Sequence, residues 1–316
     1  RGVFETLMRV QGNLPGRDRF LALGQSHLDA AWMWRVFQTR SKAKYTFRNA
    51  LRHIDQHDFF YFTQSQAVYY EWMKDRQPRI FRAIQDSVKR GRWELTGGMW
   101  VEPDGNLPDG ESLVRQRLYG QRFYLDHFGR LAEIEWLPDT FGFCWTLPQI
   151  LAKSGGKYFW TTKLLWNDTN KFPLRSFVWQ SPDGSQILTH ISPFFGMNAG
   201  DFFQKLSFNR ALKEGIKLTA NYRTNPFKIQ DSLDKQPIPE VLIAYGMGDG
   251  GGGPNEVEIE VVRTLRKSGT LDTGTAGTFF KRLEKYRGRL PVWNDELYLE
   301  FHRGCYTTQS RVKRAN

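Results

Sequence analysis

Short apolar segments alternate along this chain with longer segments in which apolar residues recur at helical spacing, and this alternation restricts the possible folds most. The segments of strand length are Phe20 to Gln25, Phe59 to Thr63, Trp93 to Thr96, Ile134 to Leu137, Tyr158 to Thr162, Val241 to Tyr245 and Leu297 to Phe301. Strands separated by helices are typical of βαβ units, whose strands lie parallel in one sheet. The pattern predicts an α/β fold with a mostly parallel sheet. A chain of 316 residues is long enough for two domains, although an α/β barrel of this size forms one.

One pair of apolar segments departs from this alternation. Phe177 and Trp179 precede the turn Pro182 to Gly184, and Ile187 and Leu188 follow it. This spacing predicts a hairpin inserted between the repeating units. The expected helices start near Glu111, cover Leu147 to Lys153, follow Pro254, and occupy, with loose connections, the polar stretch Gly200 to Pro237.

Composition excludes several classes of protein. Hydrophobic residues make up 40%, and with 29 Gly the apolar share is about half, as in globular chains that bury a core and unlike disordered or fibrous ones. No segment approaches the roughly 18 uncharged apolar residues of a membrane span. The net charge of +12 is dispersed over helical stretches, which favours a solvated basic surface over a nucleic-acid interface.

Cysteine content and the chain ends indicate the cellular setting. Cys144 and Cys305 are too few for a disulfide framework, so we expect a reducing compartment, the cytoplasm. The chain starts at Arg1 without Met or a signal-peptide pattern and ends in the basic run Arg311 to Asn316, which indicates a fragment. Aromatic residues, at 15%, exceed what a core needs, and their flat rings suit a pocket for a polar ligand with apolar faces.

Polar side chains with catalytic or metal-binding chemistry follow several predicted strands. His27 and Asp29 share one face at the end of the first strand, so both can point at one ligand. Asp139 ends another strand, where Pro138 restricts the backbone. Taken singly, each has a common structural explanation: a chance pair for the first two, and a cap for the helix at Leu147 for Asp139.

Two later strands end in further polar residues. His302 shares a face with Glu300, although a lone His at such a position is usually structural. Asp249 lies in a glycine-rich loop whose backbone can approach a ligand closely. In parallel α/β barrels the carboxyl ends of the strands open onto one face, so we expect all these residues there. Two imidazoles and two carboxylates suit Zn²⁺ or a similar transition ion better than Ca²⁺, which leaves Asp249 for proton transfer.

The stretches around these residues resemble the class II α-mannosidases, which are retaining, metal-dependent glycoside hydrolases of family 38. The similar stretches are GQSHLDAAWMWR at 24–35, GRWELTGGMWVEPDGNLPDGESLVRQ at 91–116, EWLPDTFGF at 135–143, FPLRSFVWQSPDGS at 172–185, YGMGDGGGGP at 245–254 and ELYLEFHRGCYTTQ at 296–309. They extend over nearly the whole chain. Six ordered motifs of this length are far more specific than any single pair of residues.

The resemblance implies a fold and a metal site. The fold is a seven-stranded (β/α) barrel, with residues 1–316 as the catalytic domain and the family's downstream helical and β-rich domains missing. The implied cofactor is one divalent metal, Zn²⁺ before Co²⁺ or Mn²⁺. Its implied ligands are His27, Asp29, Asp139 and His302.

The resemblance also implies roles in catalysis. Asp139 would be the nucleophile as well as a ligand, and Trp32 would pack beneath the sugar ring, with Asp29 and His302 also contacting the substrate. Asp249 matches the family's glycine-flanked Asp and is expected to be the general acid, with Glu300 as the alternative. A retaining glycosidase needs two such carboxyl groups about 5 to 5.5 Å apart.

The expected partner is a mannose-containing oligosaccharide, in mannose metabolism or N-glycan degradation, without nucleic acid or membrane. Linkage preference and a homo-oligomeric state are left open. Cys305 departs from the family pattern, which usually has Thr there, and a small buried filler is its plain explanation.

Two other enzyme classes compete with this assignment. A metal-activated water, as in carbohydrate deacetylases on a related barrel, would use the same kind of His and Asp site. Gly246, Gly248 and Gly251 formally fit the GxGxxG motif of dinucleotide-binding enzymes. That motif requires a second apolar strand ending in an acidic residue, whereas Lys267 to Gly277 is polar, so the sequence disfavours this class.

Overall fold

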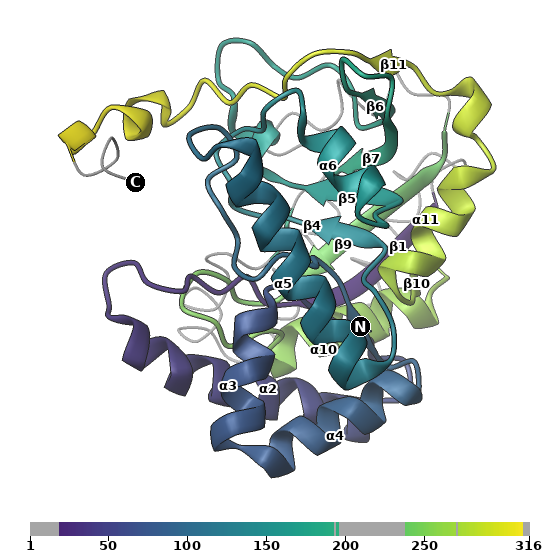
Figure 1. The fold of residues 1–316 in the computed structure, drawn as a ribbon. Helices are drawn as coiled ribbons and strands as arrows, with labels where there is room; N and C mark the ends of the chain where they lie inside the picture. Colours follow the sequence, from purple (N-terminus) through teal and green to yellow (C-terminus); the bar gives the residue numbers. More distant parts are fainter. Residues whose placement is uncertain (1–18, 193, 196–237, 270, 312–316) are drawn as a thin grey trace.

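The structure, a computed structural model, describes residues 19–192, 194–195, 238–269 and 271–311. The stretch Gly200 to Pro237, expected to be helical, lies outside the described residues. Within them, strands and helices alternate in two sheets covered by helices, as expected of an α/β fold (Figure 1).

The first sheet is parallel throughout. Its strands are β1 (Arg19–Gln25), β2 (Phe62–Gln64), β3 (Trp93–Leu95), β8 (Phe194–Phe195), β9 (Glu240–Tyr245) and β10 (Leu271–Thr273). They follow the order β3-β2-β1-β9-β8, and β10 also pairs with β1. The pairing makes β1 the central strand, so its carboxyl end lies among the ends of its neighbours.

The second sheet contains the predicted hairpin. Its order is β11-β6-β7-β5-β4. The strands are β4 (Ile134–Trp136), β5 (Tyr158–Thr161), β6 (Ser176–Gln180), β7 (Gln186–Ile191) and β11 (Val292–Trp293). Only β6 and β7 pair antiparallel, with Val178 opposite Leu188, and the other pairs in this sheet are parallel. The inserted hairpin is therefore confirmed.

The helices lie against the sheets, and some of them begin at a residue whose side chain caps their first turn. They are α2 (Val36–Gln56), α3 (Ala67–Arg76), α4 (Pro78–Lys89), α5 (Gly110–Phe128), α6 (Leu147–Lys153), α10 (Glu256–Lys267) and α11 (Ala276–Glu284), with 3-10 turns η1 (Lys163–Trp166), η2 (Arg287–Arg289) and η3 (Arg303–Tyr306). Asp109 caps α5 by accepting a hydrogen bond from Ser112 N, and Asn255 caps α10 in the same way. In Figure 1, α2, α3 and α4 lie together below the first sheet.

One apolar cluster contains side chains from both sheets. Leu21 and Leu23 of β1 pack with Trp136 of β4 and Trp160 of β5, whose rings stack with centroids 3.7 Å apart. A hydrogen bond of 2.8 Å from Gly97 N to Ile134 O joins the segment after β3 to β4. The mostly parallel α/β architecture is thus confirmed, while the described strand pairs form two sheets and do not show a closed ring.

The prediction of a strand at Leu297 to Phe301 is wrong. Only Leu297 forms a bridge, exchanging two hydrogen bonds with Phe143, and η3 begins soon afterwards. The reason lies in the Asn167 side chain, which donates to Tyr298 O at 3.0 Å and accepts from Glu300 N at 2.9 Å. This side chain takes the backbone groups that a neighbouring strand would otherwise pair.

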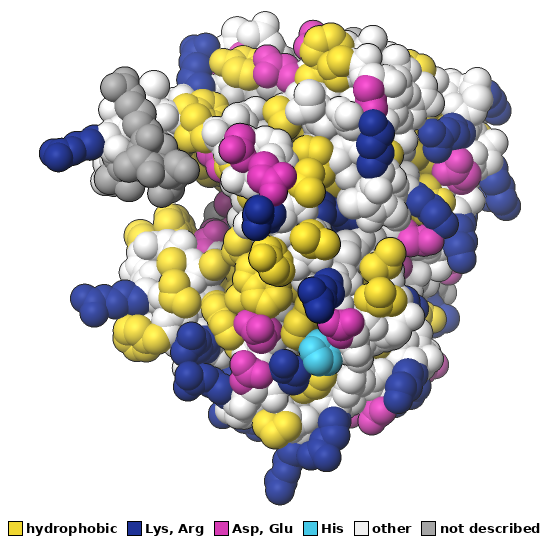
Figure 2. Space-filling view, viewed as in Figure 1, with side chains coloured by type: hydrophobic (Ala, Val, Ile, Leu, Met, Phe, Trp, Pro, Cys, Tyr) yellow, Lys and Arg dark blue, Asp and Glu magenta, His cyan; other side chains and the backbone are white. Residues whose placement is uncertain are grey.

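The surface visible in Figure 2 carries Lys and Arg side chains scattered among acidic ones, in line with the dispersed charge of the sequence. Apolar side chains also reach the surface, and on α5 they are Val114, Leu118, Tyr119 and Leu125. None of the helices in the described part of the chain combines the length and apolar character needed to cross a membrane.

Candidate active site

The site begins just after β1, where the chain leaves the central strand. The His27 side chain is 5% exposed, and its Nε2 lies 3.2 Å from Asp29 Oδ1 and 3.6 Å from Asp139 Oδ2. Asp139 comes from the segment after β4, in the other sheet. The structure therefore brings together three of the predicted ligand residues from two strand ends, where parallel strands present their functional groups.

Asp139 has a cationic neighbour that sequence reasoning missed. The buried Lys163 of η1 forms an ion pair with Asp139 Oδ1, and its ammonium group lies 3.7 Å from the centre of the Trp166 ring. Burial acts to raise the pKa of Asp139, but its hydrogen bond to His27 and the charges of His27 and Lys163 outweigh burial and lower it. Asp139 is therefore an ionised carboxylate at neutral pH.

Glu102 is a second residue that sequence reasoning missed. Its Oε1 accepts hydrogen bonds from Asp139 N at 2.7 Å and Thr140 Oγ1 at 3.1 Å, and its Oε2 lies 3.2 Å from His27 Nδ1. Glu102 lies in a loop, whereas the sequence analysis considered polar residues that directly follow predicted strands, so it did not select Glu102. The available signal was its position inside the long similar stretch at 91–116.

Asp249 reaches the same point from the glycine-rich loop after β9. Its backbone has a positive φ of 52°, and its carbonyl accepts a hydrogen bond of 2.8 Å from Asp29 N. One ligand atom each from His27, Asp139 and Asp249 lies within 4.8 Å of the others. Burial raises the pKa of Asp249, and the charges of Asp139 and Asp29 raise it further against the opposing effect of His27.

The buried imidazole shows how strongly this site attracts positive charge. Burial lowers the pKa of His27, yet the carboxylates of Glu102, Asp139 and Asp29 outweigh burial and raise it well above its ordinary value. His27 Nδ1 and Glu102 Oε2 also lack a hydrogen-bond partner among the described residues. A divalent cation would balance these carboxylates, so the residues present fit a metal site.

Two further predicted residues, Glu300 and His302, lie in the segment that precedes η3. His302 is exposed, precedes η3, and packs its ring 5.0 Å from that of Phe141, outside the His27 group of potential ligands. Glu300 accepts hydrogen bonds from Asn170 and Thr169, and those from Asn170 are the largest reason why its pKa falls to about 2. A carboxyl group held ionised in this way is a poor proton donor, which favours Asp249 as the acid.

The aromatic candidate lies close to the chain turn that carries Asp29. Trp32 is 58% exposed and meets Trp34 edge to face, with ring centroids 5.7 Å apart. Its remaining ring surface is free to pack on a ligand. Cys305 is half-buried in η3, and its backbone N–H donates to His302 O.

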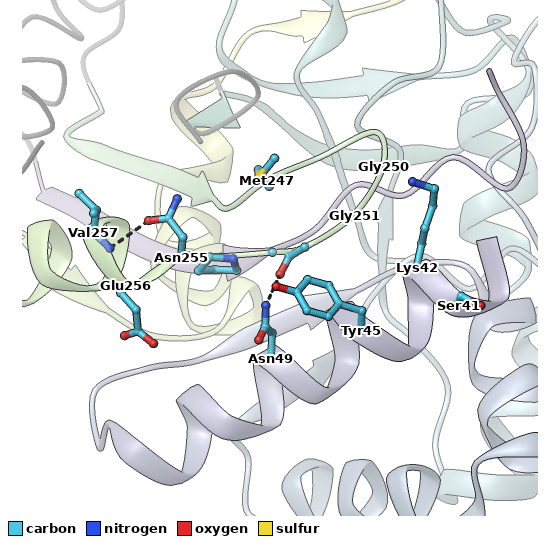
Figure 3. A pocket seen from close by; sticks show the side chains of 13 residues that line it. Ser41, Lys42, Tyr45, Asn49, Met247, Gly250, Gly251, Asn255, Glu256 and Val257 are labelled. Carbon is cyan, nitrogen blue, oxygen red and sulfur yellow. Dashed lines mark hydrogen bonds between the residues drawn. The ribbon is translucent and has the colours of Figure 1, made fainter. Parts of the chain in front are cut away.

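Two pockets lie next to the segments that carry the candidate site residues. The first, of about 280 Å³, is lined by His27, Asp29, Glu102 and Asp139, among others, so three of the predicted metal ligands face it. The second, of about 650 Å³, lies between α2 and the glycine-rich loop (Figure 3). There Asn49 Nδ2 of α2 donates to Gly252 O at 3.3 Å, which ties the loop to the helix.

Comparison with known proteins decides the family. Residues 19–296 match the glycosyl hydrolases family 38 N-terminal domain. The chain belongs to this family. It is 39% identical over 97% of its length to α-mannosidase G of Dictyostelium discoideum and 35% identical over 96% to an α-mannosidase of Saccharomyces cerevisiae. It spans 27% and 28% of the lengths of these relatives.

Solved structures agree on the fold of this family 38 chain. An α-mannosidase from Enterococcus faecalis superposes with a TM-score of 0.68 over 89% of the chain and 31% of that protein, at 16% identity. A polysaccharide deacetylase from Mycobacterium smegmatis superposes with a TM-score of 0.54 at 11% identity, over 87% of the chain and 93% of that protein. At these identities the likeness concerns the fold alone.

Proposed function

We propose that this family 38 chain is the catalytic domain of a retaining α-mannosidase. The observation that supports the proposal most is the convergence of His27, Asp139 and Asp249, from two sheets, in a chain of this family. We further propose that the two sheets complete a (β/α) barrel, that the substrate is a mannose-containing glycoside, and that the enzyme works in the cytoplasm.

The opposite pKa shifts of the two aspartates suit the two roles that a retaining mechanism needs. Asp139, kept ionised beside Lys163, attacks the anomeric carbon and displaces the leaving oxygen, which takes a proton from Asp249. Asp249 then removes a proton from water, which attacks the same carbon and frees Asp139. Their oxygens lie within 4.8 Å, close to the about 5 to 5.5 Å typical of retaining enzymes.

The metal belongs to the same proposal. His27, Asp29 and Asp139 would hold a divalent ion, Zn²⁺ before Co²⁺ or Mn²⁺, with His302 as the proposed fourth ligand. When bound, such an ion would attract hydroxyl oxygens of the mannose and so help to hold the sugar ring in a distorted conformation. Trp32 would pack against the apolar face of that ring, and Asp29 and His302 would contact the sugar beside the ion.

A covalent trap tests the nucleophile. A fluorinated mannosyl donor is expected to label Asp139, and mass spectrometry of the digested protein locates the adduct. Asp139→Ala is expected to leave only a trace of activity in folded, metal-loaded protein, whereas Asp126→Ala, on the exposed side of α5, is the matched control. Acetate release from acetylated sugars without an adduct would support the deacetylase class instead.

Leaving-group dependence tests the acid. An activated aryl mannoside needs little proton donation, so it is expected to rescue the first step in Asp249→Ala, while a poor leaving group is not. Equal losses on both substrates would contradict the role of Asp249. The same comparison on Glu300→Ala decides between the two carboxylates.

A further inference from the structure

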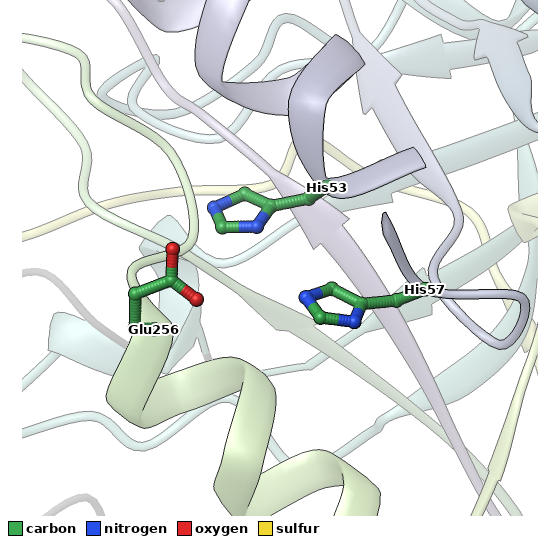
Figure 4. A group of neighbouring side chains, drawn as sticks. All are labelled: His53, His57 and Glu256. Atoms are coloured by element: carbon green, nitrogen blue, oxygen red, sulfur yellow. The ribbon is translucent and has the colours of Figure 1, made fainter. Parts of the chain in front are cut away.

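A second group of potential metal ligands lies where the end of α2 meets the start of α10. His53 belongs to the last turn of α2, His57 follows one turn later as its C-terminal cap, and Glu256 is the first residue of α10. One ligand atom from each lies within 4.8 Å of the others. Figure 4 shows the two rings and the carboxylate gathered from the two helices. None of these residues belongs to the candidate active site.

The imidazoles of this group lack the partners that buried polar atoms normally have. His53 is fully buried, and neither of its ring nitrogens has a partner in good hydrogen-bond geometry among the described residues, although the backbone of Pro254 lies near enough to act on its pKa. His57 Nε2 is likewise buried and unpartnered, although its Nδ1 has a partner. Buried polar groups in folded proteins almost always have a hydrogen-bond partner, so these unpaired nitrogens indicate that a ligand binds to them.

We propose that His53, His57 and Glu256 bind a divalent transition-metal ion, Zn²⁺ or a chemically similar one. Imidazole nitrogen and carboxylate oxygen are ligands that Zn²⁺ accepts together, whereas Ca²⁺ and Mg²⁺ prefer oxygen alone. Two His separated by one helical turn are a common arrangement for such an ion. Small side-chain movements are enough, because ligand atoms around tetrahedral Zn²⁺ lie about 3.4 Å apart.

Two arginines compete with the ion. Arg52 pairs with Glu256 at 2.9 Å, and both side chains are about half exposed, so the arginine can release the carboxylate into a metal site. Arg263 donates to His57 Nδ1 at 3.0 Å, and this nitrogen must carry a proton when Nε2 binds a metal. Arg263 can then move fully to Glu260, with which it already pairs at 2.7 Å.

The proposed site has a structural consequence for the candidate active site. Glu256 follows Pro254 and Asn255, which end the glycine-rich loop that carries Asp249. The pocket in Figure 3 is lined by this loop, by Glu256 and by Tyr45 and Asn49 of α2. An ion bridging α2 and α10 would fix the far end of that loop, so binding should raise the thermal unfolding temperature.

Zinc stoichiometry and affinity, measured by dialysis and calorimetry on the purified protein, test the proposal. His57→Gln and Glu256→Gln, at partly exposed positions, are expected to bind one ion fewer than the unmodified protein, or to bind it at least about tenfold more weakly. His127→Gln, on α5, is the matched control. Arg52→Gln frees Glu256 and is expected to tighten binding.

The outcomes separate this site from the candidate active site. Loss of the same ion on His57→Gln and on Glu256→Gln, with a second ion lost on His27→Ala, supports both sites. Unchanged stoichiometry and affinity in both His57→Gln and Glu256→Gln, or weaker binding in Arg52→Gln, would overturn the second site and leave the proposed function standing. Loss of binding only in His57→Gln and Glu256→Gln would overturn the active-site metal instead.

Discussion

Glu102 connects two of the proposed metal ligands at the scale of single residues. One oxygen accepts from Asp139 N at 2.7 Å, and the other lies 3.2 Å from His27 Nδ1. A carboxylate behind a metal-binding histidine sets its tautomer and raises its basicity. Glu102→Gln keeps the size and the acceptor but removes the charge, so metal affinity is expected to fall about 10- to 100-fold, as measured by competition with a chelator.

The control for this change is a glutamate on the surface, whose side chain forms one ion pair. Glu133 pairs with Lys157 at 2.6 Å, and both side chains are well exposed. Glu133→Gln is expected to leave metal affinity unchanged because the site is not in contact with it. Equal metal affinities for the Glu102→Gln and unmodified proteins would show that the charge of Glu102 does not contribute to metal binding.

Sequence reasoning found the site residues that follow β1, β4 and β9 and missed two residues in contact with them. Side-chain alternation placed His27 and Asp29 on one face, and the structure brings both beside Asp139. Lys163 and Glu102 lie in a 3-10 turn and a loop, and they reach the site only through tertiary packing. No local pattern encodes such a contact.

At the scale of elements, the glycine-rich loop depends on a close backbone approach at Gly246. This residue has φ of 129°, and a Cβ built on it would lie 2.3 Å from Gln25 O. Gly246→Ala must therefore move the loop away from β1. We expect a loss of roughly 2–4 kcal/mol in the free energy of unfolding, measured by urea denaturation, from strain and overpacking together.

Gly110→Ala is the matched control for the loop. Gly110 is the first residue of α5, and a Cβ there would meet nothing within 4 Å. Alanine also favours the helix, so stability should stay the same or rise slightly. A Gly246→Ala protein as stable as the control would mean that the loop tolerates a side chain at β1.

The capping box of α10 predicts a pH dependence of stability. Glu258 is fully buried, accepts from Asn255 N at 2.9 Å, and has its pKa raised from 4.5 to about 8 by burial. Between these two values the folded protein holds a proton that the unfolded chain has lost, so stability falls as pH rises through this window. Glu258→Gln is expected to remove that loss.

Thermal unfolding as a function of pH checks this prediction. From pH about 4.5 upward, the free energy of unfolding of Glu258→Gln should rise relative to that of the unmodified protein. Near pH about 8 this relative gain should be on the order of a few kcal/mol. Glu260→Gln, two residues later on the same helix, should leave the slope unchanged. Parallel curves for Glu258→Gln and the unmodified protein would refute the shifted pKa.

Elements with strong local signals were predictable, and those defined by distant partners were not. Helix α6 has the predicted bounds, and the turn at Pro182 to Gly184 closes the predicted hairpin. By contrast, Leu297 to Phe301 has the composition of a strand, but Asn167 takes its backbone hydrogen bonds. A strand needs a neighbour, and the sequence does not say which segment supplies it.

At the scale of the whole molecule, the contact between the two sheets determines the relative positions of the site residues. His27 and Asp249 follow strands of the first sheet, whereas Asp139 follows a strand of the second. Any relative movement of the sheets therefore changes the distance between the proposed nucleophile and its partners. The alternation of strands and helices predicted an α/β fold with a mostly parallel sheet, but not how the two sheets meet, because part of that contact is a buried ion pair between α5 and β4.

That ion pair predicts a large effect on global stability. Arg117 of α5 is 1% exposed and binds Glu135 of β4 at 2.7 Å, while it also donates to Gly97 O after β3 and to Ser154 after α6. Arg117→Met would leave Glu135 buried without its partner. Removing one member of a buried pair typically costs about 3–5 kcal/mol, and we expect a loss of that size in urea denaturation.

Arg115, two residues earlier on the same helix, provides the matched comparison. It pairs with Glu111 at 2.9 Å, but both side chains are mostly exposed, so Arg115→Met is expected to cost only about 0.3–0.5 kcal/mol. The double variant Arg117→Met with Glu135→Leu should recover much of the single loss, because it leaves no unpaired charge. If Arg117→Met cost no more than Arg115→Met, the two sheets would have to be held by their shared apolar cluster and the Gly97–Ile134 hydrogen bond, and the position of Asp139 relative to His27 would not depend on this pair.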